Sequence, residues 1–571
     1  MSRSVESIRY GNAGAQRRPN SQVATALLAG AMWLLSTQPA KPQHAEMGAF
    51  APVLPSPNEP LRPGNEVFGA GGTGMPASWQ APPIQAPAGD YVATGTDAGR
   101  LLTEDDIKRI VDECLKEKEA AAKKPDSGTK FSADWRDGLV FERTDKAFRM
   151  QFGARLNEDW VAFSESAALD PAPPVGVGVL RNGTFFRRLR LQTRGQMWEQ
   201  VEFNMEFDFE NIETRTTPPG GTPPAISTVA FDHMWWGLKD VPVFGTVRVG
   251  NQRVPQTLEA FHDSKWLTFM ERTAAFDAFM LDFAPGILVS NTYFDQHVTW
   301  HNMFHRTSGL APRFAELGTG ADFGSSEWAA TTRLTLLPIY EDEGRYFLHL
   351  GESYQWRRAK FDSDLQARVV GYRARPEIRD SNGFAQESNN NRFLDTGLIE
   401  ASNSHLLCSE AMANLGSLHL RSEYYLVMVE DAAVRSGQAI IPLDNSVFHG
   451  FYVQASYFLT GEHQPYDRRF GVPDRPHPIT NFHWATIDKS CERGLGLWEI
   501  AARYTYLNLG TIPGGGGTGG GVLSDFNLGL NWWLNSNMKV QWNYIHANRD
   551  VPAPNHDGAV DAFGMRFAID F

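Results

Sequence analysis

Short segments of strictly alternating hydrophobicity recur along most of the chain, and they constrain its fold more than any other feature. Between residues 129 and 571, runs of about ten residues carry apolar side chains at every second position and polar or charged ones between them. Clusters of Gly, Pro, Asn and Asp separate these runs. A period of two is the pattern of a β-strand whose two faces meet different surroundings. The pattern predicts an all-β region of 443 residues.

The run that starts at residue 148 and the run that ends the chain show the pattern clearly. In the first, Phe148, Met150 and Phe152 alternate with Arg149 and Gln151. The chain ends on DAFGMRFAIDF, residues 561–571, with an aromatic residue in the last position. A closing strand with a C-terminal aromatic resembles the recognition signal of bacterial outer-membrane barrels.

A soluble β-sandwich also alternates, so strand length has to separate the two folds. Strands of roughly nine to eleven residues match a tilted crossing of a membrane, and aromatic residues often mark their ends, as at membrane interfaces. No stretch offers the eighteen apolar residues of a membrane-spanning helix. We expect a transmembrane antiparallel β-barrel of about 16 strands over residues 129–571, because this number allows about 28 residues for each strand and its connection; eighteen strands also fit.

The first 128 residues have a different character. Residues 1–45 place four arginines before the apolar stretch 23–35, which predicts a secretory signal peptide with cleavage near Ala40 or Ala45. Residues 46–100 are rich in Pro, Gly and Ala and predict a flexible tether. Residues 103–124 predict a periplasmic helix with a narrow apolar stripe, either solvated on its own or involved in oligomerisation.

Charge and cysteine content exclude several classes of protein. The chain has 66 acidic and 53 basic residues and a net charge of −13, which argues against nucleic acid as a partner. Its three cysteines form no zinc-binding spacing, and Cys408 with Cys491 is the pair that a disulfide would join. We expect no cofactor and no metal. Three histidines spaced by four, residues 297, 301 and 305, fit a polar patch better than a metal site, because no acidic or Cys partner lies at ligand spacing.

Several stretches resemble the phosphate-selective porin O and P family. They include VFERTDKAFRMQFGARLNEDW at 140–160, VRVGNQRVPQTLEAFHDSKWLTFMERTAAFDAF at 247–279 and FYVQASYFLTGEHQPYDRRFG at 451–471. The resemblance implies a sixteen-stranded homotrimeric barrel in outer-membrane lipid, with loops folded inward. It implies a porin without enzymatic activity, for small hydrophilic solutes, with anions such as phosphate among the candidates.

Arginine accounts for forty of the 53 basic residues, and guanidinium groups bind oxyanions in bidentate fashion. A row of lumen-facing arginines would pass an anion along; alternatively, the arginines pair with Glu202, Glu206, Asp208, Glu423 and Glu499 to brace the wall. The candidate anion contacts are Arg149, Arg155, Arg188, Arg190, Arg194, Ser264, Lys265, Arg373, Arg375, Arg421 and Arg503.

Two features weaken the expectation of phosphate selectivity. Residues 129–571 contain 40 basic and 52 acidic residues. Where phosphate-selective members carry lysine and then Ser-Ser-Lys, this chain has Ala260 and then Asp263, Ser264 and Lys265. Two other functions compete with the porin: a secreted all-β carbohydrate-binding or glycoside-hydrolysing protein, suggested by 16 Trp and 15 Tyr, and a barrel that attaches the outer membrane to the cell wall.

Overall fold

The computed structural model describes residues 112, 130–209, 229–307, 327–362, 365–380, 392–436, 439–443, 446–483, 494–513 and 517–571. The predicted signal peptide and tether lie outside these residues. So does the predicted helix 103–124, apart from Asp112, which is helical and exposed. Among the described residues, no helix is both long and apolar enough to cross a membrane.

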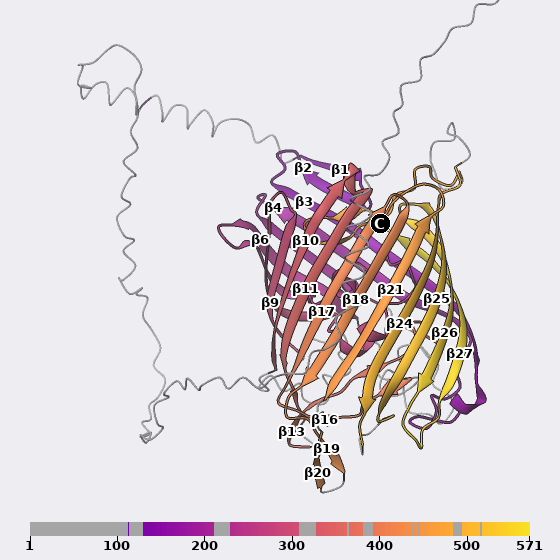
Figure 1. Cartoon of the computed structure of the whole chain (residues 1–571). Coiled ribbons are helices and arrows are strands. Elements are labelled where there is room, and N and C mark those ends of the chain that lie inside the picture. The colour runs from indigo at the N-terminus through magenta and orange to yellow at the C-terminus, as the bar shows by residue number, and fades with distance from the viewer. Residues whose placement is uncertain are drawn as a thin grey trace, which may run out of the picture. The chain divides into compact units, whose positions relative to one another are not determined.

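Sixteen strands of the described region form a closed antiparallel barrel (Figure 1). Each wall strand pairs with its neighbours in the chain, and β27 pairs with β3 to complete the ring. The predicted all-β barrel is confirmed, and the alternative of eighteen strands is wrong. The wall strands are β3 (Phe148–Glu165), β4 (Gly183–Met197), β5 (Val201–Asp208), β6 (Ala230–Val241), β7 (Gly245–Arg253), β8 (Phe283–Tyr293), β9 (Val298–Arg306), β10 (Trp328–Glu341), β11 (Tyr346–Arg358), β17 (Asn403–Leu415), β18 (Leu418–Val429), β21 (Val447–Phe458), β24 (Leu497–Thr511), β25 (Gly520–Asn535), β26 (Met538–Asp550) and β27 (Gly558–Asp570).

The two faces of each wall strand meet different environments, as the alternation predicts. On β27, Phe563 and Phe567 are 49% and 43% exposed on the outer face. Arg566 and Asp570, on the inner face of the same strand, are 1% and 6% exposed. On this part of β27 the charged side chains therefore face the lumen, and the aromatic ones face lipid.

The connections show which end of the barrel faces which compartment. At one end most turns are short, such as residues 198–200 and 242–244; at the other end the connections are long. Outer-membrane barrels have short periplasmic turns and longer extracellular loops, so the end that carries the C-terminus is periplasmic. A hairpin of β1 (Phe131–Trp135) and β2 (Leu139–Arg143) pairs with β3 at this end.

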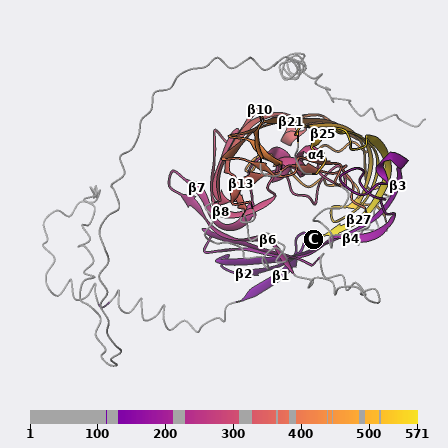
Figure 2. The ribbon, with the colours of Figure 1, turned by 90° about the horizontal axis from the view of Figure 1, so that it is seen from below.

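Several connections carry secondary structure of their own, and the view along the barrel shows segments crossing its interior (Figure 2). Residues 254–282, the inward loop, contain α3 (Leu258–Phe261) and α4 (Ala274–Phe279). The periplasmic connection 459–496 contains β22 (Tyr466–Asp467) and β23 (Val472–Pro473) and is unusually long for its end. The smaller elements are η1 (Ala167–Leu169), η4 (Asp342–Gly344), β12 (Lys360–Asp362), β13 (Ala367–Val370), β14 (Arg373–Ala374), β15 (Leu394–Asp395), β16 (Ile399–Glu400), β19 (Ala433–Ser436) and β20 (Ala439–Pro442).

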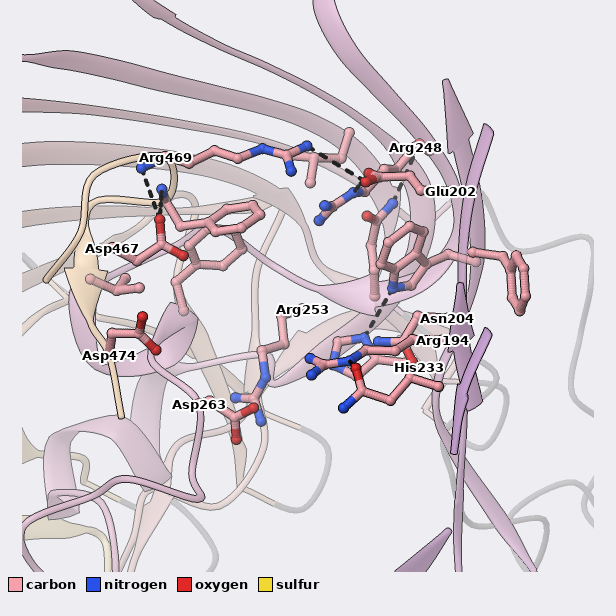
Figure 3. A pocket seen from close by; sticks show the side chains of 18 of the residues that line it. Arg194, Glu202, Asn204, His233, Arg248, Arg253, Asp263, Asp467, Arg469 and Asp474 are labelled. Carbon is pink, nitrogen blue, oxygen red and sulfur yellow. Dashed lines mark hydrogen bonds and ion pairs between the residues drawn. The ribbon is translucent and has the colours of Figure 1, made fainter. Parts of the chain in front are cut away.

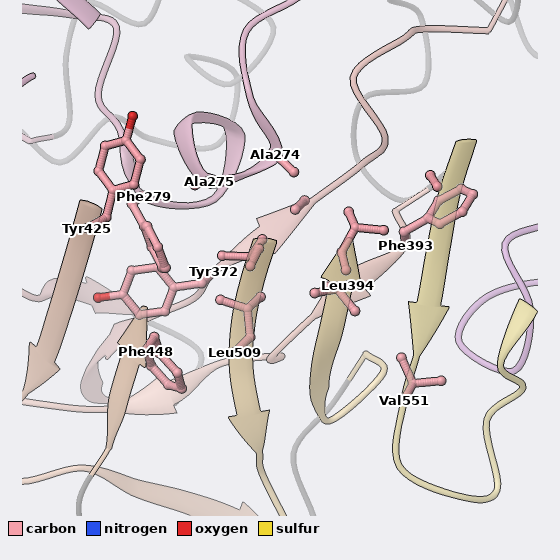
Figure 4. Close-up of a cluster of buried hydrophobic side chains, with 14 of the residues drawn as sticks. Ala274, Ala275, Phe279, Tyr372, Phe393, Leu394, Tyr425, Phe448, Leu509 and Val551 are labelled. Carbon is pink, nitrogen blue, oxygen red and sulfur yellow. The ribbon is translucent and has the colours of Figure 1, made fainter. Parts of the chain in front are cut away.

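An apolar cluster holds two of these connections against the wall (Figure 4). Phe279 of α4 meets Tyr372 of the 359–402 connection with ring centroids 5.7 Å apart. Tyr372 in turn meets Phe448 of β21 at 5.2 Å. Burying such rings contributes about 2 kcal/mol each. This side of the lumen is thus a packed core, which leaves the β3–β7 side for a passage.

The C-terminal residue completes the seam between β27 and β3. Phe571 N–H donates to Ala154 O at 3.0 Å, and Ala154 N–H donates to Phe571 O at 3.1 Å. The Phe571 ring contacts Trp135 of β1 with centroids 5.3 Å apart. A side chain at Gly153 would place its Cβ 2.4 Å from Phe571 O, so this glycine allows the close approach.

We expect Gly153→Val to loosen the seam, because the added side chain overlaps the Phe571 carbonyl oxygen. Overpacking of this kind reduces the free energy of unfolding by about 2 kcal/mol. Urea titration of the detergent-purified barrel, followed by its heat-modifiable band, measures the effect. Ala154→Val is the matched control, since residue 154 lies on the outer face, where valine is tolerated. Equal midpoints for the two variants would contradict this account.

Candidate functional site

The inward loop is ordered by caps at the start of both of its short helices. The Thr257 hydroxyl accepts a hydrogen bond from Ala260 N–H at 3.0 Å, and the Thr273 hydroxyl accepts one from Phe276 N–H at 3.2 Å. Side chains at these positions satisfy the free N–H groups of a helix start. The Glu259 carboxylate also accepts from the Thr273 hydroxyl at 2.6 Å, while Glu423 of β18 accepts from Glu259 N–H at 3.0 Å. The loop is therefore fixed both internally and to the wall.

Polar side chains of the wall hold the middle of the loop through its backbone. Asn543 of β26 accepts from Met270 N–H at 2.8 Å. Asn531 of β25 donates to Thr268 O at 2.8 Å, and Lys539 of β26 donates to Leu267 O at 3.0 Å. Buried backbone groups need such partners, so these contacts decide where the loop can cross the lumen.

Glu271 of the inward loop lies within a group of arginines. Arg187 of β4 donates to both of its oxygens, at 2.7 and 2.9 Å, and Arg566 of β27 lies 2.9 Å away. Arg379 of the 359–402 connection is 3.7 Å away. Burial alone would raise the pKa of Glu271, but Arg187, Arg566 and the other arginines outweigh it and hold this pKa well below its usual range. Glu271 is thus a built-in anion within the arginine cluster.

Five of the predicted anion contacts lie along the β3–β4 wall. Arg155 donates to the Ser264 hydroxyl at 3.0 Å and to Ser264 O at 2.7 Å, which joins two predicted contacts directly. Lys265 donates to Gln192 at 3.2 Å. On β4, Arg188 is 4% exposed, and its Nε and Nη1 have no hydrogen-bond partner among the described residues. Arg149 and Arg194 lie nearer the periplasmic end on β3 and β4.

Arg190, between Arg188 and Arg194 on the same face, is neutralised. It lies 2.8 Å from Asp208 and 2.9 Å from Glu206, and it also pairs with Asp232. Arg190 therefore braces the wall, as the alternative interpretation of the arginines expects for Glu206 and Asp208.

The other predicted arginines lie elsewhere in the lumen. Arg373, in the two-residue strand β14, and Arg375 belong to the 359–402 connection and not to a wall strand; Arg375 lies 3.5 Å from Asp277 of α4. Arg421 of β18 donates to the Tyr452 hydroxyl at 2.6 Å. Arg503 of β24 pairs with Glu377 and stacks over Phe269 at 4.3 Å. Each of the last three is committed to holding an inward segment or a wall contact.

Asp263 stands in the inward loop where phosphate-selective members carry serine, and it changes the electrostatics of the loop. Burial tends to raise the pKa of Asp263, but Lys265, Arg253 and Arg155 outweigh it and hold that pKa well below its usual value. Asp263 is therefore ionised and lies 4.0 Å from Arg155. A fixed carboxylate thus competes with any mobile anion for the cations around Ser264.

A cavity of roughly 480 Å³ lies between the β3–β7 wall, the inward loop and the periplasmic connection 459–496 (Figure 3). Its cations include Arg149, Arg194, Arg248, Arg253 and Arg469. Its carboxylates are Glu202, Asp263, Asp467 and Asp474. The lining thus contains both cationic and anionic side chains.

Sequence reasoning missed several of these groups. Arg187 follows Phe186 out of the alternation, because the register between β3 and β4 shifts by one residue and directs both Arg187 and Arg188 inward. For Glu271, the only signal in the sequence was its position within the family-like stretch 247–279. Arg248 also faces the lumen, but it was not among the predicted anion contacts. It lies 4.1 Å above the Trp235 ring and 2.7 Å from Glu202.

His301, His305 and Cys408 are buried. His305 shares a hydrogen bond with the Thr331 hydroxyl at 2.9 Å, whereas His301 packs against Phe261 with ring centroids 4.8 Å apart. Cys408 is a free, buried thiol, and its suggested partner Cys491 lies outside the described residues.

Comparisons with known proteins agree with this architecture. The model of the family Phosphate-selective porin O and P matches residues 178–571. Porin O of Pseudomonas aeruginosa is 23% identical over 466 residues, covering 76% of this chain and 91% of that protein. An uncharacterised protein of Caulobacter vibrioides is 26% identical over 396 residues, covering 68% of each chain.

Two solved structures show lower similarity. OprB of Pseudomonas putida, in its high-pH structure, has a TM-score of 0.42 at 9% identity, covering 74% of this chain and 94% of that one. The anion-selective porin from Comamonas acidovorans has a TM-score of 0.40 at 12% identity, covering 74% and 100%.

The family match and the closed barrel decide between a channel and a secreted carbohydrate-active protein. The alternative of a secreted carbohydrate-binding or glycoside-hydrolysing protein is wrong. The protein is a channel of the bacterial outer membrane and not an enzyme. With its inward loop and lumen-facing arginines, the chain belongs to the phosphate-selective porin O and P family.

Proposed function

We propose that the channel is water-filled and lets small hydrophilic solutes diffuse passively, with a preference for anions. The observation that carries this proposal is the row of arginines along the β3–β4 wall. Arg149 and Arg194 line the cavity, and their side chains form no ion pair with a described residue. Arg188 lies further along β4 with two unpartnered nitrogens. Unpaired guanidinium groups in a lumen attract oxyanions and lower the barrier to their passage.

The preference is moderate, because fixed carboxylates oppose it. Arg190 is already paired with three acidic residues, and Glu271 occupies the cluster around Arg187. Ser264 and Lys265 hydrogen-bond to the wall, and Asp263 stands beside them. Phosphate then passes as one small anion among others, without a high-affinity site at this loop.

The assembly and the amino-terminal region complete the proposal. The resemblance to the porin O and P family supports a homotrimer. The composition of residues 1–45, 46–100 and 103–124 supports an export signal, a tether and a periplasmic helix, in that order. Attachment of the outer membrane to the cell wall is a second candidate function, which only this extension favours.

Planar bilayers under a KCl gradient test the anion preference. We expect the sign of the wild-type reversal potential to show that chloride is more permeable than potassium. We expect Arg194→Gln to lower the chloride-to-potassium permeability ratio by about twofold. A unit charge acting through water over ~8 Å contributes about 0.5 kcal/mol, which corresponds to this factor.

Arg435→Gln is the matched control for Arg194→Gln. It removes the same charge from an exposed pair with Glu400 outside the lumen, so its permeability ratio should equal that of the wild type. A cation-selective wild-type pore, or equal shifts for the two variants, would refute the proposed role of the arginine row.

Deletion of residues 46–124, with the export signal retained, tests the amino-terminal region. We expect conductance per pore to be unchanged, because the barrel closes through β27 and β3 without these residues. Cross-linking in detergent then measures trimer content, and envelope fractionation measures association with the cell wall. Loss of trimers would assign the helix to oligomerisation, whereas loss of cell-wall association alone would assign the region to tethering.

A further inference from the structure

Two arginines and two aspartates of the cavity lie on different walls. Arg149 and Arg194 come from β3 and β4, whereas Asp467 and Asp474 come from the periplasmic connection 459–496. Figure 3 shows Asp467 and Asp474 on one side of the cavity and Arg194 on the other. A solute in the cavity lies between Arg149 and Arg194 on one side and Asp467 and Asp474 on the other, so these four charges produce a field across the pore.

These four side chains are available to a solute. Arg194 donates through Nε to Gln151 at 3.1 Å, which leaves its terminal nitrogens without a partner among the described residues. Asp467 accepts only backbone N–H groups, from Arg469 and Phe470, and Asp474 accepts only from Arg475 N–H. No ion pair within the described chain neutralises them, in contrast to Arg190 and Glu202.

Two buried polar atoms in the same lining also lack a partner. Gln252 is 2% exposed, and its Oε1 has no hydrogen-bond donor among the described residues. The Trp266 Nε1 group is likewise buried without an acceptor. Buried polar groups normally have partners, so this part of the lining favours a solute that both donates and accepts hydrogen bonds.

Arginines lie over three of the aromatic rings that line the cavity. The guanidinium of Arg248 covers the Trp235 ring at 4.1 Å, and that of Arg469 lies 5.1 Å from the Phe470 ring. Arg475 lies 5.5 Å from the Trp266 ring. With these faces occupied, recognition depends on charge and hydrogen bonding.

We propose that this cavity is a transient binding site for zwitterionic solutes of the size of short peptides. The carboxylate of the solute meets Arg149 and Arg194, its ammonium group meets Asp467 and Asp474, and its amide groups hydrogen-bond to Gln252 and Trp266. This assignment rests on the proposed diffusion channel and names the solute class that the channel favours.

The two aspartates themselves favour a cationic partner. Burial, and then the charge of Asp474, raise the pKa of Asp467 above its usual value. Two nearby carboxylates repel each other, and an ammonium group between them relieves that repulsion. A cavity of roughly 480 Å³ also falls within the range of sites that bind small molecules, and a tripeptide is small enough to enter it.

Liposome-swelling assays with the full-length protein test the proposal directly. The probes are triglycine, which is a zwitterion, and N-acetyl-triglycine amide, which has a similar length and no charge. We expect triglycine to enter about two to five times faster, a factor typical of a few solvent-exposed charge contacts. Equal rates, or faster entry of the uncharged peptide, would overturn the proposal.

Two double variants separate a transverse field from simple ion selectivity. Arg149→Gln with Arg194→Gln, and Asp467→Asn with Asp474→Asn, should both reduce the triglycine-to-amide ratio. Their chloride-to-potassium permeability ratios should move in opposite directions, downward for the first variant and upward for the second. Opposite shifts in the triglycine ratio would show that only net charge matters, and they would overturn the proposal.

Controls keep this outcome distinct from failure of the fold or of the proposed channel. Asp342→Asn with Glu343→Gln removes two exposed acidic residues from the β10–β11 turn, outside the cavity, and should leave the triglycine ratio unchanged. Heat-modifiable migration shows that each variant has formed its barrel. The wild-type reversal potential judges the anion preference separately, so one proposal can fail while the other stands.

Discussion

Closure of the backbone hydrogen-bond ring is the constraint on which the rest of the structure depends. A strand inside hydrocarbon has no water to satisfy an open edge, so β27 must find β3. The last peptide groups of the seam involve Phe571 and Ala154, and Gly153 leaves room for them. Once the ring is closed, the alternation assigns every second side chain to the interior. The interior then has to accommodate many charged groups in a confined space.

Most of that charge is balanced within the protein, and the balancing partners are what position the inward segments. Arg566 of β27 binds Asp159 of β3 and Glu271 of the inward loop, so one guanidinium joins the closing seam to the loop. Arg503 joins β24 to Glu377 of the 359–402 connection in the same way. Breaking a buried pair leaves an uncompensated charge, so these contacts fix the loop positions firmly. Around the cavity, Arg149, Arg194, Asp467 and Asp474 have no ion-pair partner among the described residues, and they are available to solutes.

The alternation made the barrel predictable, and it placed Arg155, Arg188, Arg190 and Arg194 on the lumen face. The number of strands was open between sixteen and eighteen because pairing partners do not follow from the period alone. Inward segments have no period, so no pattern in the sequence placed Arg373 and Arg375 in the 359–402 connection. The site depends on contacts between distant segments, such as Arg155 with Ser264 and Asp263. No local pattern predicts which arginines pair with a carboxylate, and none marked Asp467 and Asp474 as residues of the cavity.

The bulge at Arg187, where β4 has one more residue than the paired part of β3, has a wider consequence. At this point Arg187 and Arg188 both face inward, while Phe186 and Leu189 on either side face outward. A single added residue has therefore increased the positive charge inside the pore without placing a charge in the lipid. In such barrels, short insertions within a strand give evolution a route to new selectivity that leaves the membrane-facing surface intact.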